Sequence, residues 1–173
     1  MARTKVAKVK IHGDAQNAPF AIAIGQLIIA WSNNESLFLA ILQALVHGSK
    51  ASANIIWRAQ RNTRSRMQMV RALVVEHITD ETLITRLDEA IAHFKALSRW
   101  RNFYCHAMYE YHNKVLVEAS GGDDNFATVT KALNLGTLNE IQNATELLHT
   151  FNLEMWRIVR AIDTHLGVKR DDK

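Results

Sequence analysis

The sequence contains a single cysteine and a single proline among its 173 residues. Cys105 has no second cysteine with which to form an internal disulfide, and zinc sites built from several cysteines are excluded. This scarcity favours a reducing compartment, so we expect a cytoplasmic protein. Pro19 stands near the start of a long apolar segment, and proline suits the first position of a helix. No proline interrupts the chain after it, which favours long helices.

The sequence also lacks an apolar run long enough to cross a membrane. The run from Ala18 to Trp31 is followed by the polar residues 32–36, whereas a spanning helix needs about 20 predominantly apolar residues. We therefore expect no membrane association and interpret the run as a buried helix. Residues 1–17 are expected to form a basic N-terminal arm, residues 18–167 a single helical domain and residues 168–173 a charged tail.

Acidic residues are the minority charge, since 21 lysines and arginines face 17 aspartates and glutamates, which gives a net charge of +4. A mild positive excess is compatible with an acidic partner such as nucleic acid, and equally with an ordinary solvated surface. The second predicted helix carries a ridge of arginines, which fits either a nucleic-acid contact or a solvated surface. Its candidate RNA contacts are Arg58, Arg61, Arg64 and Arg71.

Hydrophobic periodicity predicts an all-α fold, an up-and-down four-helix bundle with a small β-hairpin inserted between helices three and four. The expected helices cover residues 19–47, about 49–77, 80 to about 108 and 137–166. Thr137 and Glu140 have the spacing of a capping box, and Gly167 is a helix stop. The hairpin is expected over residues 114–120 and 126–131, joined by the turn-forming run 121–125.

Three of the predicted helices each place one ionisable residue on a core-facing stripe: Glu35, Arg66 and Arg101. A charge on an apolar face needs a partner. Glu35 and Arg66 could form a buried pair that only fixes helix packing. Alternatively, the pair could support Arg101 or a bound phosphate from behind.

Metal sites of the familiar kinds are not present in the sequence. A di-iron bundle requires two Glu-x-x-His pairs, and the chain has only Glu146 with His149. No Gly-rich phosphate loop is present either. We therefore expect no metal and no cofactor.

The most informative stretch is Arg101-Asn102-Phe103-Tyr104-Cys105-His106, at the end of the third predicted helix. It joins a fixed positive charge, an amide and an imidazole, which together are able to handle a phosphodiester without a metal. The stretch resembles the Arg-polar-x-x-x-His signature of the HEPN superfamily of small helical proteins. The resemblance extends to Trp31, Glu35 and the Thr63-Arg64-Ser65-Arg66 segment.

The resemblance implies a homodimer in which two copies of the motif form one composite site. Such proteins are often metal-independent endoribonucleases, frequently toxins or defence factors, some of them with an antitoxin partner. It would assign His106 as general acid or base, Arg101 to stabilise phosphate charge and Asn102 to orient the phosphate or the imidazole. Arg101 and His106 are five positions apart, so their directions differ by about 140° around the helix axis. The alternative is a non-catalytic helical dimer that binds RNA or a protein partner.

Overall fold

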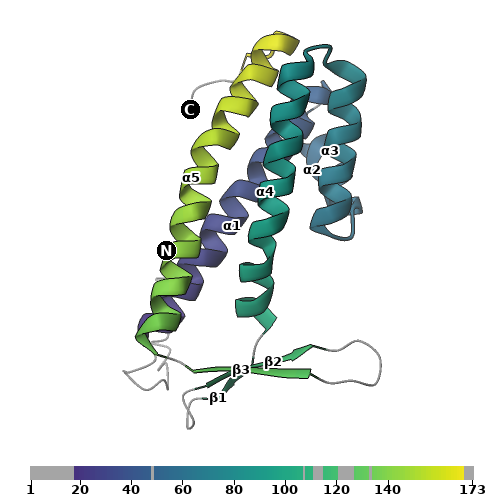
Figure 1. Ribbon diagram of the computed structural model, residues 1–173. Coiled ribbons are helices and arrows are strands. Elements are labelled where there is room, and N and C mark those ends of the chain that lie inside the picture. The colour runs from purple at the N-terminus through teal and green to yellow at the C-terminus, as the bar shows by residue number, and fades with distance from the viewer. Residues whose placement is uncertain are drawn as a thin grey trace, which may run out of the picture.

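The computed structural model describes residues 18–47, 49–106, 108–110, 115–120, 127–132 and 134–169. Within these residues the chain forms five helices and three strands, and Figure 1 shows the helices standing together on one side of the strands. The elements are, in order, α1 (Ala18–Leu45), α2 (Lys50–Ala59), α3 (Thr63–His77), α4 (Glu81–His106), β1 (Met108–Glu110), β2 (Val115–Ser120), β3 (Ala127–Ala132) and α5 (Leu135–Leu166). The expected N-terminal arm, the 121–125 turn and the end of the tail lie outside the described residues.

The centre of the core is formed by α1, α4 and α5, and α2 and α3 pack against it with Trp57, Met67, Val70 and Val74. The beginnings of α1 and α5 lie together at the sheet end of the molecule, while α4 runs in the opposite direction and descends toward the sheet (Figure 1). Phe94 of α4 is 1% exposed and lies at the centre of this core. Its ring stacks on Trp31 of α1 with centroids 3.9 Å apart and on Phe151 of α5 at 5.5 Å. These rings join the three helices in one apolar layer.

Polar groups set the ends of α5. Asn134 caps the helix, and its side-chain oxygen accepts a hydrogen bond from the backbone N–H of Thr137 at 3.0 Å. The predicted start at Thr137 is therefore wrong by two residues. The helix begins at Leu135, because the Asn134 side chain already caps the free N–H groups at that point. The helix ends at Gly167, whose φ of 65° lies in the left-handed region that favours glycine. This stop is confirmed.

The predicted second helix is two helices, so the four-helix count is wrong. α2 ends at Ala59, and the Asn62 side chain accepts the backbone N–H of Ser65 at 2.9 Å to cap α3. A short polar side chain that bonds the backbone locally starts a new helix more readily than it continues an old one. The all-α class is retained, because the core residues that the structure describes belong to the helices and to Ile78 at the end of α3.

The segment between α4 and α5 contains a three-stranded antiparallel sheet in the order β1-β2-β3. β2 pairs with β3 from Val115 opposite Ala132 to Ser120 opposite Ala127. We predicted two strands in this region, and the structure adds β1, which pairs Met108 with Val117. The predicted third helix extended to about residue 108, but α4 ends at His106 and Met108 opens β1.

Among the described residues, none of the helices combines the length and the apolar character needed to cross a membrane.

Candidate functional site

The predicted contact between Glu35 and Arg66 is present and joins α1 to α3. Glu35 Oε1 accepts hydrogen bonds from Arg66 Nη1 at 2.8 Å and from Thr63 Oγ1 at 3.0 Å. The Arg66 guanidinium also lies over the Trp57 ring, 5.1 Å from its centroid. Arg66 Nε is buried and has no hydrogen-bond partner among the residues that the structure describes.

This ion pair is half-buried rather than buried, with side-chain exposures of 19% for Glu35 and 23% for Arg66. Within the described residues, no hydrogen bond or ion pair joins this pair to Arg101. The hydrogen bond that the Arg101 guanidinium makes within the described residues goes to the neighbouring Asn102, from Nη1 to Oδ1 at 3.0 Å. Glu35 and Arg66 therefore fix the packing of α1 and α3, and Arg101 belongs to a different surface.

Arg101 does not lie in the core as its place on the helical wheel predicted; it is half-buried. The reason is the register between α3 and α4, which the ion pair of Arg71 with Asp88 defines. Because α3 and α4 are antiparallel, residues at equal distances before Arg71 and after Asp88 lie opposite each other. Thr63, the first residue of α3, is eight residues before Arg71, and Ala96 is eight residues after Asp88. Arg101 therefore lies beyond the start of α3, where that helix no longer covers α4.

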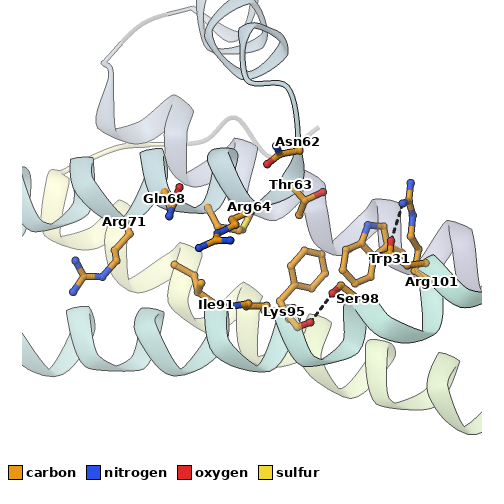
Figure 2. Close-up of a pocket in the computed structure, with 13 residues that line it drawn as sticks. Trp31, Asn62, Thr63, Arg64, Gln68, Arg71, Ile91, Lys95, Ser98 and Arg101 are labelled. Atoms are coloured by element: carbon orange, nitrogen blue, oxygen red, sulfur yellow. Dashed lines mark hydrogen bonds between the residues drawn. The ribbon is translucent and has the colours of Figure 1, made fainter. Parts of the chain in front are cut away.

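The Arg101–Asn102 pair forms one end of a groove of about 540 Å³ between α3 and α4. Figure 2 shows Arg101 at one end and Arg71 at the other, with Trp31 of α1 between the two helices. The volume lies in the range of ordinary ligand sites. Its lining residues are Trp31, Asn62, Thr63, Arg64, Met67, Gln68, Arg71, Ile91, Phe94, Lys95, Ser98, Arg101 and Asn102.

The charge of this groove has one sign. Four lining residues are cationic and none is an aspartate or a glutamate. Arg71 is neutralised by Asp88, to which its Nε and Nη2 donate at 2.6 and 2.9 Å, and these hydrogen bonds raise the pKa of Arg71. Arg64 and Lys95 make no ion pair within the described part of the chain. The groove is therefore suited to an anion.

The structure separates the sequence-predicted site residues into two groups. Arg64, Arg71, Arg101 and Asn102 line the groove. Arg58 and Arg61 are exposed but do not line it. His106 is exposed on the last turn of α4 and does not line the groove either.

Lys95 and Gln68 are groove residues that the sequence reasoning missed. The available signal was spacing, because residues 91, 95, 98 and 102 are separated by four, three and four positions and share one face of α4. This face was overlooked because the apolar stripe beside it dominates the helical pattern.

Cys105 lies next to the site but is a poor nucleophile. Burial raises the pKa of its thiol, and the charge of Arg101 opposes that shift only in part. Since the thiolate is the reactive form, catalysis through this cysteine is disfavoured. Within the described ranges, no group of three His, Cys, Asp or Glu side chains is arranged to hold a metal ion.

Comparisons with protein-family models, with curated proteins and with solved structures found no match for this chain. The function of this chain therefore has to be inferred from the geometry of the groove and from the motif at its end.

Proposed function

We propose that this protein is a HEPN-like, metal-independent endoribonuclease that acts on RNA at a composite site in a homodimer. The observation that carries the proposal is the position of Arg101 and Asn102, hydrogen-bonded to each other at one end of a groove that has cations and no carboxylate in its lining. A phosphodiester is the ligand class that such a site attracts most strongly. We further place the protein in the cytoplasm, with an antitoxin as a partner to test.

The chemistry is attack of an RNA 2′-hydroxyl on the adjacent phosphorus, with loss of the 5′-oxygen of the next nucleotide. Arg101 stabilises the charge that develops on the phosphate oxygens, and Asn102 orients the phosphate. His106 takes the proton from the 2′-hydroxyl or returns one to the leaving oxygen. The products are a 2′,3′-cyclic phosphate and a 5′-hydroxyl, and no metal is required.

A homodimer accounts for the separation of Arg101 from His106. On α4 their directions differ by about 140°, and only Arg101 lines the groove. In the proposed dimer, His106 of the partner subunit completes the site at which Arg101 binds the phosphate. Exposed apolar side chains on α1 and α5 provide surface for an interface between copies, among them Ile29, Leu153 and Trp156.

The second candidate is a non-catalytic helical module that binds RNA. One observation favours it: the groove is complete within one chain and does not include His106. This module would bind the same ligand through Arg64, Lys95 and Arg101, without cleavage.

RNA cleavage in the presence of EDTA separates the two functions. We expect wild-type protein to produce cyclic phosphate ends and His106→Ala to lower the rate by at least about 100-fold. His149→Ala is the matched control, because His149 is also an exposed helical histidine but lies on α5. Intact RNA after incubation with folded wild-type dimer, or His106→Ala that cleaves like the control, would contradict catalysis.

A mixing experiment tests the composite site. Arg101→Ala and His106→Ala chains, inactive alone, form mixed dimers in which one site retains Arg101 from one chain and His106 from the other. We expect activity to return on mixing, to about a quarter of the wild-type level when mixed dimers are half of the population and one of their two sites works. If mixing restores nothing, the two residues do not act across the interface.

A further inference from the structure

The groove contains two cations that face each other across it. Arg71 of α3 pairs with Asp88 of α4, and this contact fixes which residues of the two antiparallel helices lie opposite. Arg64 precedes Arg71 by seven residues, and Lys95 follows Asp88 by seven residues. Seven residues are almost two complete turns, so each helix returns to nearly the same face. Arg64 and Lys95 therefore oppose each other as Arg71 and Asp88 do.

The structure agrees with this register. Both Arg64 and Lys95 line the groove, and Figure 2 shows each of them extending from its own helix into the space between α3 and α4. Asp88 supplies the negative charge opposite Arg71, whereas among the described residues no carboxylate lines the groove opposite Arg64. Like charges held opposite each other repel, and a bound anion between them removes the repulsion. This arrangement therefore favours an anion in the groove.

We propose that Arg64 and Lys95 together bind one phosphate, and that Arg101 and Asn102 bind the next phosphate of the same single-stranded RNA. Lys95 and Arg101 are six residues apart on α4, which corresponds to about 9 Å along the helix axis. Their long side chains can adapt this separation to successive phosphates of an extended strand. This inference rests on the proposed function, because it takes RNA as the ligand, and it adds a second binding position to that site.

The rest of the lining fits bases on both sides of the Arg64–Lys95 position. Toward Arg71, Ile91 is half-buried and offers apolar surface, and the Gln68 amide carries a donor and an acceptor; toward Arg101, the lining includes the hydroxyl of Thr63 and the amide N–H groups of Asn62 (Figure 2). Single-stranded RNA is recognised by contacts of this kind, in which a base face lies on an apolar surface and its edge bonds polar groups. A pocket of about 540 Å³ accommodates one or two nucleotides rather than a double helix.

The first test uses inorganic phosphate and does not depend on RNA. We expect phosphate to raise the melting temperature of the wild-type protein above its value in sodium chloride of equal ionic strength. In the double variant Arg64→Gln, Lys95→Gln this difference should be smaller than in the wild type, because only the Arg101–Asn102 position remains for phosphate. The matched control is Lys50→Gln, Arg160→Gln, which removes one lysine and one arginine that are exposed and lie outside the groove. A phosphate effect that is absent from wild type, or equal in the double variant and the control, overturns the anion position.

The second test measures binding of a short 2′-O-methyl RNA, which has no free 2′-hydroxyl and is not cleaved. We expect the groove variant to bind about tenfold more weakly than the control variant at moderate salt. The slope of log K against log salt should fall by about 0.7, the value for one phosphate on a single strand. Equal slopes in the two variants would contradict the proposal.

The two tests distinguish failure of this inference from failure of the proposed function. If wild-type protein cleaves RNA while the groove variant binds RNA and phosphate normally, the second phosphate position is wrong and the ribonuclease stands. If phosphate stabilises wild type more than the groove variant, and RNA is bound without cleavage, the position stands and the catalytic claim falls. If phosphate is bound and RNA is not, the polymeric ligand is wrong.

Discussion

Two arginines of α3, only two residues apart, have opposite surroundings. Arg66 faces α1, where Glu35 accepts its hydrogen bond at 2.8 Å and Trp57 covers its guanidinium. Arg64 lies on the other side of the helix, is exposed and lines the groove together with Lys95, and neither forms an ion pair within the described residues. The paired charge of Arg66 is explained by packing, whereas we propose that the unpaired charges of Arg64 and Lys95 bind a phosphate. The comparison separates the structural side of α3 from the side proposed to bind RNA.

The largest effect on stability is expected at Phe94, which lies in the layer between the two sides. Phe94→Ala should lower the free energy of unfolding by about 4 kcal/mol, because the side chain is fully buried and its removal leaves a cavity between α1, α4 and α5. Urea denaturation measures this change. Phe94→Leu retains much of the volume and should cost less than half as much; equal losses for both variants would mean that filling the layer is not what Phe94 does.

A smaller effect is expected at Glu35, on the structural side. Glu35→Gln should lower the free energy of unfolding by about 2 kcal/mol, because Arg66 loses its charged acceptor. Half-burial of the pair keeps this below the roughly 3–5 kcal/mol typical of a broken buried ion pair. Glu89→Gln, at an exposed position of α4, is the control and should change stability by less than about 0.5 kcal/mol. Affinity for RNA should be unchanged in Glu35→Gln, and a loss of binding would erase the distinction between the two sides.

The smallest changes in melting temperature are expected for variants of groove residues. They should have opposite signs at Lys95 and at Arg71. Without an anion, Lys95→Gln should raise the melting temperature slightly at low salt, because it removes repulsion with Arg64. Arg71→Gln should lower it slightly, because Asp88 loses its partner. Both differences should shrink at 1 M salt, where screening acts over about 3 Å. Calorimetry at two salt concentrations measures them, and shifts of the same sign in the two variants would contradict the assigned register.

The sequence predicted individual elements better than it predicted their contacts. The long helices, the stop at Gly167 and the Glu35–Arg66 contact follow from periodicity, glycine conformation and the need of a buried charge for a partner. The break at Asn62 was missed because apolar periodicity continues on both sides of it, and a cap depends on one local hydrogen bond. The position of Arg101 was misjudged because a helical wheel contains no information on where the neighbouring helix ends.

The sequence by itself determined that the chain is helical, which faces of its longest helices are apolar, and that Arg101, Asn102 and His106 share the end of one helix. Only the tertiary structure decided which charges meet. The register of α3 against α4 is set by side chains far apart in the chain, so it gives Arg71 a carboxylate and Arg64 a lysine although both residues belong to the same run of arginines. That register, which no local pattern contains, is the basis for the anion site proposed in the groove.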